Sequence, residues 1–260
     1  MLRARVIPCL LIKNGGLVKT TRFNQPKYIG DPINAVRIFN EKEADELLVL
    51  DIDATVQGRE PNYQMIRNLA AECRMPLCYG GGVKTVNHFK RIVSLGVEKV
   101  AIATAAVNDP ALVTLASKVV GGQSVVVVLD IRKKRFSDKY EVFTYNGLKA
   151  SGLMATDYAQ MMETLGAGEI VVNSIDLDGK MTGYDHELVE QVRNRVTVPV
   201  TALGGAGSLN DIRSLIERFG IIGAAAGSLF VFKGKYRAVL INYPDRNEKD
   251  ALCSSVKNAE

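Results

Sequence analysis

The sequence lacks several features that would mark particular classes of protein. It has no tryptophan and only two histidines, and its four cysteines (Cys9, Cys73, Cys78 and Cys253) include no CxxC pair. Zinc-ligand spacing is therefore absent, and we expect reduced thiols, no metal site and no cofactor. No apolar run reaches the ~18 residues that span a bilayer, and the N-terminal apolar stretch is too short for a signal peptide. We therefore expect a cytoplasmic protein that binds no membrane.

The charged residues exclude further functions. The net charge is +5, and the one basic run, residues 132–135, has no interleaved aromatic residues, so we expect no nucleic-acid binding. The mild positive excess suits anionic small molecules or acidic partners. His88 and His186 fall on predicted helices, and no Ser/His/Asp or Cys/His arrangement can be placed. Covalent catalysis therefore has no support.

Short runs rich in valine, isoleucine and leucine alternate with longer amphipathic stretches. Nearly continuous apolar strands are typical of parallel sheets that are covered on both faces. Eight strand–helix units favour an α/β protein with a (β/α)8 TIM barrel over a dinucleotide-binding sheet. We predict strands at 5–11, 46–51, 76–79, 99–103, 124–130, 169–174, 198–203 and 221–225. We predict helices at 32–43, 63–73, 85–95, 109–119, 157–165, 185–194 and 209–218.

The predicted barrel covers residues 1–235, and residues 236–260 are expected to form a C-terminal helix and tail that is partly disordered. Two connections are long. Residues 13–31 read as a polar loop, and residues 131–153 read as a hairpin that closes at Asn146 and Gly147. Both follow the C-terminal ends of strands, where the active sites of barrel enzymes lie.

Two glycine-rich turns, at 80–82 and 204–207, are near copies of each other. Thr104 follows Gly81 by 23 positions, and Ser228 follows Gly205 by the same number. A glycine turn that opens onto a helix presents free backbone N–H groups to an anion. The matched spacing predicts one ligand with a phosphate at each end.

The duplication extends over both halves of the chain. VLDID at 49–53 corresponds to SIDLD at 174–178, and each half opens with a comparable apolar strand. Alignment of LLIK in the first of these strands with LDIR in the second places Leu11 opposite Asp130. The repeat of about 120 residues predicts a half-barrel internal duplication.

Carboxylates gather at the predicted C-terminal ends of the strands. They are Asp51, Asp53, Asp130, Asp176 and Asp178, with Lys19 and Asn173 nearby. Carboxylates do not bind phosphate, so we expect them to contact the middle of the ligand, as general acid or base or as acceptors for hydroxyl groups. The alternative is that some of them, such as Asp53 and Asp176, only cap the following helix or orient a loop, and that Lys19 is a solvated loop residue.

A second charged set lies at the opposite, N-terminal ends of the strands. Its members are Arg5, Glu46, Lys99 and Glu169. Buried charges must be paired, so these residues are expected to form a ring at the floor of the barrel. The ring is either a structural plug or the gate to a channel through the barrel.

The motifs RVIPCL, GDPI, DELLVLDI, YGGGV, EKVAIATAAV, VVVLDI, GAGEIVVNSIDLDGKMTGYD and ALGGAGS occur in this order. In this series the chain resembles the HisF-type cyclase subunits of imidazole glycerol phosphate synthase. The resemblance implies that the two turns hold a bis-phosphorylated aminoimidazole-carboxamide ribonucleotide. The implied contacts are Gly81, Gly82 and Thr104 for one phosphate, and Gly179, Gly204, Gly205, Gly227 and Ser228 for the other.

The resemblance also implies a partner. In this family a HisH-type glutaminase docks at the barrel floor as the other half of a heterodimer, and ammonia travels through the interior. Arg5, Glu46, Lys99 and Glu169 match the family's charged gate, which favours the gate over the plug.

One departure concerns catalysis. The family uses two aspartates for acid–base chemistry, and this chain has Asp130 but Leu11 in the other place, while Ala103 replaces an asparagine. Leucine transfers no proton. The segments CLLIK and GSLFVFKGKYRAVLINYP resemble the glycosyl amidation-associated (WbuZ-type) branch, linked to surface-polysaccharide (O-antigen) genes. That branch is thought to supply ammonia to a separate amidotransferase that acts on a nucleotide-linked acetamido sugar.

Three hypotheses follow. The first is the synthase-type subunit of a glutamine-dependent amidotransferase complex for sugar amidation. The second is an active cyclase of histidine biosynthesis that pairs Asp130 with a substitute such as Asp51 or Asp178. The third is a non-catalytic scaffold that binds a phosphorylated ligand and activates the glutaminase.

Overall fold

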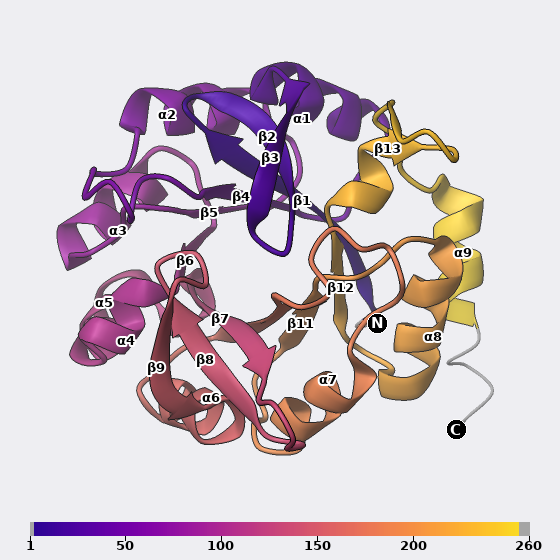
Figure 1. Cartoon of the computed structure of the whole chain (residues 1–260). Coiled ribbons are helices and arrows are strands. Elements are labelled where there is room, and N and C mark those ends of the chain that lie inside the picture. The colour runs from indigo at the N-terminus through magenta and orange to yellow at the C-terminus, as the bar shows by residue number, and fades with distance from the viewer. Residues whose placement is uncertain (1–2, 255–260) are drawn as a thin grey trace.

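The eight predicted strands form one parallel sheet that closes on itself, as the computed structural model, which describes residues 3–254, shows (Figure 1). Closure is made by β1, which pairs with β12 on one side and with β4 on the other. The predicted (β/α)8 barrel is confirmed. In order around the barrel, the strands are β1 (Arg5–Lys13), β4 (Leu47–Asp51), β5 (Leu77–Gly80), β6 (Lys99–Ile102), β7 (Val125–Lys133), β10 (Glu169–Ser174), β11 (Val200–Leu203) and β12 (Gly223–Ala226).

Helices cover the outside of the barrel. The ends of the seven predicted helices lie within two residues of their predicted positions, whereas α4 was not predicted. Side-chain caps fix several of the helix starts: Asp31 accepts a hydrogen bond from the N–H of Asn34, and Ser208 and Asp211 form a capping box. The helices are α1 (Pro32–Glu41), α2 (Tyr63–Glu72), α3 (Val86–Ser94), α4 (Thr104–Asn108), α5 (Ala111–Val120), α6 (Ala155–Thr164), α7 (His186–Arg193) and α8 (Leu209–Phe219), with short 3-10 helices η1 (Gly122–Ser124) and η2 (Ser228–Phe230).

The first strand of each half-barrel continues into an antiparallel hairpin. Strands β2 (Gly16–Thr21) and β3 (Asn24–Gly30) follow β1, and strands β8 (Tyr140–Thr144) and β9 (Lys149–Met154) follow β7. The second hairpin turns at Asn146 and Gly147, as predicted. The first hairpin shows that the prediction of a polar loop at 13–31 was wrong, because this segment forms β2 and β3. Leu17 and Val18 are buried when β2 pairs with β1, and that burial outweighs the polar character of the segment. The shared hairpins agree with the half-barrel duplication.

Alternate residues of the barrel strands point to the interior, where they form an apolar cluster separate from the one between strands and helices. The side chains of this inner cluster lie between the floor of the barrel and its C-terminal mouth. They are Ile7, Cys9, Leu48, Cys78, Ala101, Val126, Val128, Val171, Leu203 and Ala225.

The segment after the barrel packs back onto it. It contains β13 (Phe232–Lys233), β14 (Ala238–Val239) and α9 (Arg246–Ser254). The hydroxyl of Tyr243 donates to the carbonyl of Val6 at 2.8 Å and accepts from the N–H of Asp45 at 3.1 Å. The expectation of disorder at 236–260 falls partly on residues 255–260, which lie outside the described residues. In the part of the chain that is described, no helix has the length and apolar character needed to cross a bilayer.

We predict that Tyr243→Phe lowers the free energy of unfolding by about 1–3 kcal/mol, because it leaves a buried N–H and a buried carbonyl without their partner. Urea unfolding followed by circular dichroism measures the effect. Tyr236→Phe is the matched control, since Tyr236 is 91% exposed, and should change stability by less than about 0.5 kcal/mol. Equal stability of the two variants would contradict the structural role of Tyr243.

Candidate functional site

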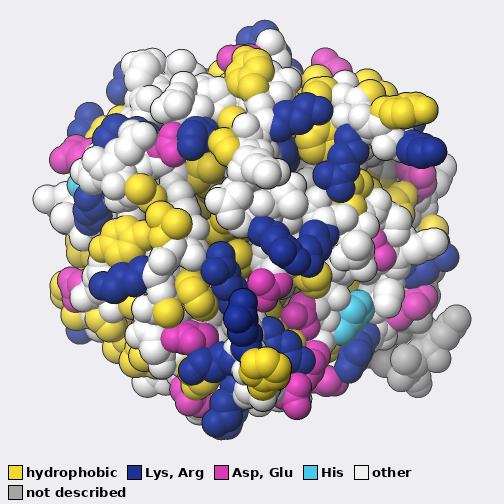
Figure 2. Space-filling view, in the orientation of Figure 1, with side chains coloured by type: hydrophobic (Ala, Val, Ile, Leu, Met, Phe, Trp, Pro, Cys, Tyr) yellow, Lys and Arg dark blue, Asp and Glu magenta, His cyan; other side chains and the backbone are white. Residues whose placement is uncertain are grey.

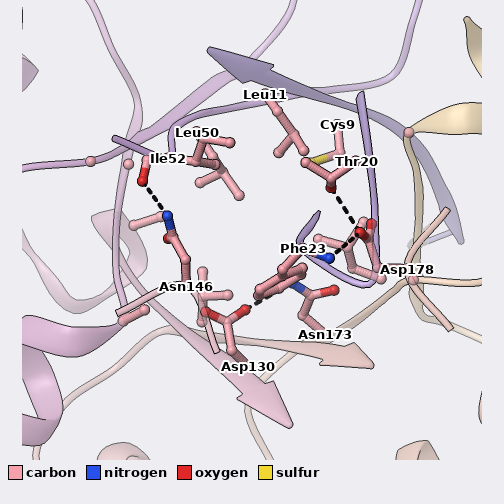
Figure 3. Close-up of a pocket in the computed structure, with 18 of the residues that line it drawn as sticks. Cys9, Leu11, Thr20, Phe23, Leu50, Ile52, Asp130, Asn146, Asn173 and Asp178 are labelled. Carbon is pink, nitrogen blue, oxygen red and sulfur yellow. Dashed lines mark hydrogen bonds between the residues drawn. The ribbon is translucent and has the colours of Figure 1, made fainter. Parts of the chain in front are cut away.

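A pocket opens at the C-terminal ends of the barrel strands, and both halves of the chain line it (Figure 3). Apart from Asp53 and Asp176, the structure brings together the residues predicted to contact substrate or phosphate, although their roles remain predictions. These lining residues are Lys19, Asp51, Gly81, Gly82, Thr104, Asp130, Asn173, Asp178, Gly179, Gly204, Gly205, Gly227 and Ser228. Leu11 also lines the pocket, on the opposite side from Asp130 (Figure 3).

The first glycine turn requires glycine at two positions. Gly81 and Gly82 have φ angles of 125° and 72°. A Cβ on Gly81 would lie 2.5 Å from the carbonyl oxygen of Asp51, and one on Gly82 would lie 2.7 Å from that of Arg59. The backbone therefore forms the pocket wall without side chains, as an anion cradle requires. On the neighbouring strand end, the hydroxyl of Thr104 accepts a hydrogen bond from the N–H of Tyr145.

The second glycine turn is built in the same way. Gly204 and Gly205 have φ angles of 93° and 107°, and a Cβ on Gly204 would lie 2.6 Å from the carbonyl oxygen of Ser174. Gly227 leaves room for the ammonium group of Lys19, whose Nζ would lie 2.7 Å from a Cβ at that position. The second cradle thus has a cation at its edge.

Lys19 is a buried pocket residue and not a solvated loop residue. Its side chain is 4% exposed, and its ammonium group donates to the backbone carbonyl of Cys9. Burial lowers the pKa of Lys19, while the charge of Asp178 opposes that change. Burial likewise raises the pKa of the Cys9 thiol to about 11, which keeps the thiol protonated at neutral pH.

Asp130 is the candidate acid–base residue, and its environment favours the protonated form. Its carboxylate accepts a hydrogen bond of 2.8 Å from the side-chain amide of Asn173. Burial raises the pKa of Asp130 to about 7; the Asn173 hydrogen bond opposes the rise and the charge of Asp178 adds to it. A carboxyl group with a pKa near neutrality can both donate and accept a proton at physiological pH.

The other carboxylates are held by hydrogen bonds. Asp51 Oδ1 accepts from the N–H groups of Asp53 and Ala54, and Asp178 Oδ2 accepts from the hydroxyl of Thr20 and the N–H of Phe23. Burial raises the pKa of Asp178, against the effect of these hydrogen bonds.

Asp53 and Asp176 are not among the pocket-lining residues. Asp53 lies 3.6 Å from the ammonium of Lys13, and Asp176 accepts from the N–H of Lys133. Both therefore fit the alternative reading, in which they support loops. Within residues 3–254, no three His, Cys, Asp or Glu side chains are placed to share a metal ion.

Sequence reasoning missed the pocket residues that the hairpins supply. Phe23 comes from the turn between β2 and β3, and Asn146 comes from the turn between β8 and β9. The Asn146 amide donates to the carbonyl of Ile52 at 2.6 Å, which ties the second hairpin to the first half-barrel (Figure 3). The Asn-Gly turn could be predicted, but the long-range partner of its side chain carries no sequence signal.

The four charged residues at the floor form one closed ring. Arg5 pairs with Glu46 and, at 2.7 Å, with Glu169, while Lys99 pairs with both glutamates at 2.8 Å. Burial disfavours all these charges, but their mutual attraction raises the pKa of Arg5 and of Lys99 and lowers that of Glu169. The ion pairs of the ring therefore offset the cost of burying its charges.

Comparison with known proteins identifies relatives over nearly the whole chain. The family model described as "Histidine biosynthesis protein" matches residues 5–237. A protein of Leptospira borgpetersenii, provisionally named imidazole glycerol phosphate synthase subunit HisF, is 54% identical over 252 residues, which are 97% of this chain and 99% of that one. A Vibrio vulnificus protein, provisionally named subunit hisF3 of the same synthase, is 55% identical over 249 residues, or 96% of each chain. The imidazole glycerol phosphate synthase subunit HisF of Clostridium botulinum is 39% identical over 233 residues, covering 90% of this chain and 92% of that one.

The raised pKa of Asp130 predicts a pH-dependent effect on stability. The pKa is about 7 in the folded protein and 3.8 in a solvated aspartate, so the folded protein binds the proton more tightly and ionisation destabilises the fold. Between pH 4 and pH 7, the free energy of unfolding of Asp130→Asn should rise relative to the natural chain by about 2–4 kcal/mol, and the difference should then level off. Urea unfolding at a series of pH values measures it. If the difference in unfolding free energy between Asp130→Asn and the natural chain stays constant from pH 4 to pH 7, the raised pKa of Asp130 is contradicted.

Proposed function

This chain belongs to the histidine biosynthesis protein family, among the HisF subunits of imidazole glycerol phosphate synthase, and from that premise we propose that it delivers ammonia for sugar amidation. It pairs with a HisH-type glutaminase at the barrel floor, and ammonia leaves at the C-terminal mouth. A separate amidotransferase then uses the ammonia on a nucleotide-linked sugar of a surface polysaccharide. The observation that carries this proposal is the leucine at position 11.

Leu11 removes one half of an acid–base pair. It lines the pocket opposite Asp130, so the pocket has a proton-transferring group on one side and a hydrocarbon group on the other (Figure 3). The candidate substitutes are already engaged: Asp51 accepts two backbone N–H groups and Asp178 holds the β2–β3 turn. Loss of a general acid or base lowers a rate by ~10²–10⁴-fold, which disfavours complete cyclase turnover.

The floor and the interior support an ammonia path. The ring of Arg5, Glu46, Lys99 and Glu169 separates the N-terminal face from the apolar inner cluster. A neutral ammonia molecule crosses an apolar interior at far lower cost than an ammonium ion, because the ion would have to be desolvated. Lys99 is the ring member best suited to move, since its long flexible side chain can leave the two glutamates without backbone change.

An active cyclase of histidine biosynthesis is the second candidate. Two observations favour it: both glycine cradles are present, and Asp130 has a pKa suited to proton transfer. A non-catalytic scaffold that binds a phosphorylated ligand is less well supported, because it gives no reason for the charged ring or for the apolar interior.

Complementation of a cyclase-deficient histidine auxotroph separates the first two candidates. We expect no growth from the natural sequence and growth from Leu11→Asp, which restores the second carboxyl group. Leu11→Asn is the matched control, since asparagine has the same shape as aspartate but no acidic group. We expect no growth of the auxotroph with this variant. In the purified heterodimer, cyclase turnover should be at least ~10²-fold higher in Leu11→Asp than in the natural chain. Growth supported by the natural sequence would overturn the amidation proposal.

The gate has its own test. In cells whose own copy of the gene is deleted, Lys99→Met should lower the amide content of the surface polysaccharide by about tenfold, because ammonia no longer passes the ring coupled to glutamine hydrolysis. Mass spectrometry of the isolated polysaccharide measures this, and a high concentration of ammonium in the medium should restore the amide. Lys118→Met removes the same charge from the exposed side of α5 and should have no effect. Normal amidation in Lys99→Met would rule out the gate.

A further inference from the structure

Four basic residues lie close to residues that line the pocket, although none of the four is itself a lining residue. They are Arg22, Lys180 and Arg237, from three loops, and Arg132, from strand β7, here called the cationic rim. Figure 2 shows lysine and arginine side chains gathered across the middle of this face, over the pocket and its hairpins.

Contacts place three of these residues around the segment 178–180, which contains the second-cradle residue Gly179. The N–H of Arg22 donates to the carbonyl of Asp178 at 3.0 Å, and the guanidinium of Arg237 donates to the carbonyl of Gly179 at 3.3 Å. Lys180 follows Gly179 directly in the chain. The guanidinium of Arg237 thus contacts the outer edge of the second cradle, and Arg22 and Lys180 are attached to the same segment through the backbone.

Arg132 reaches the same region from the other hairpin. It lies two residues after Asp130 on β7, so its side chain leaves the strand on the pocket side. A Cβ on Gly147 would be 3.4 Å from Nη2 of Arg132 and 3.4 Å from Cδ2 of Phe23. Phe23 lines the pocket and follows Arg22 in the chain, so the guanidinium of Arg132 lies near the β2–β3 turn that carries Arg22.

The cationic rim is not neutralised. Among the ion pairs of residues 3–254, none involves Arg22, Arg132, Lys180 or Arg237, whereas the nearby Lys133 and Lys134 do have acidic partners. Two carboxylates lie in this region, and both already accept hydrogen bonds: Asp176 from Lys133, and Asp178 from Thr20 and Phe23. Unpaired cations at one side of a concave site attract an anionic group.

We propose that the cationic rim binds a second phosphate directly next to the phosphate in the second cradle. The ligand on this side of the pocket is then a diphosphate ester, in which one phosphate meets the backbone of the cradle and the next meets guanidinium groups. Guanidinium groups suit this role because they form paired hydrogen bonds to phosphate oxygens. The proposal rests on the second cradle and goes beyond the delivery of ammonia.

Isothermal titration calorimetry of the whole chain at low ionic strength tests the rim, with orthophosphate and inorganic diphosphate as probes. Diphosphate should bind at least about tenfold more tightly than orthophosphate, since only diphosphate fills both positions. Arg132→Ala and Arg237→Ala should each lower the affinity for diphosphate by roughly tenfold and change that for orthophosphate by less than about twofold. Two variants in different parts of the chain guard against the misfolding of either one.

Arg135→Ala is the matched control. It removes the same charge, but from an exposed arginine of the β7–β8 turn. An equal loss of affinity in Arg135→Ala, or equal affinities for the two probes, would overturn the proposal. A nucleoside diphosphate and geranyl diphosphate then identify the source: tighter binding of the first indicates a nucleotide-linked ligand, and tighter binding of the second a lipid-linked one. If both bind more weakly than orthophosphate, the rim is not a diphosphate site. None of these outcomes depends on growth of the histidine auxotroph.

Discussion

Closure of the parallel sheet between β1 and β12 is the constraint on which the other features of this molecule depend. In a closed barrel every second residue of each strand must point inward, and neighbouring strands contribute side chains at the same height. The strand register therefore places the inward-pointing side chains in three layers along the barrel axis. The charged ring is at the floor, apolar residues such as Ile7 and Val171 are above it, and Leu11 and Asp130 are at the mouth.

Burial acts on the charges of the floor and on those of the mouth with opposite results. At the floor, each cation has two carboxylate partners, and their attraction exceeds the cost of removing the charges from water. At the mouth, Asp130 has only the neutral amide of Asn173, so burial raises its pKa. Ion pairing thus offsets burial at the floor, whereas burial without an ion pair leaves Asp130 half-protonated near neutral pH.

The sequence predicts the barrel well because its strands are short apolar runs separated by capped helices, and both signals are local. The glycine cradles could be predicted for the same reason: a positive φ angle at Gly81 or Gly205 demands glycine whatever the surroundings. The β2–β3 hairpin could not, because Leu17 and Val18 become strand residues only through pairing with β1. Phe23 and Asn146 enter the pocket from hairpin turns, and the positions of such turns are set by contacts with distant strands.

Binding and proton transfer depend on different parts of the chain, so a half-barrel repeat can conserve one and lose the other. The cradles are backbone features, and their shape does not depend on the side chain at position 11. Proton transfer needs one particular carboxyl group at one particular height, and a single substitution lowers its rate by ~10²–10⁴-fold. Leu11 also has a positive consequence for an ammonia path. Beside the mouth of the interior, Leu11 donates no proton to ammonia and offers no carboxylate that would hold an ammonium ion, whereas Asp130 stands on the opposite wall. An apolar residue at this position therefore suits a barrel that passes ammonia onward.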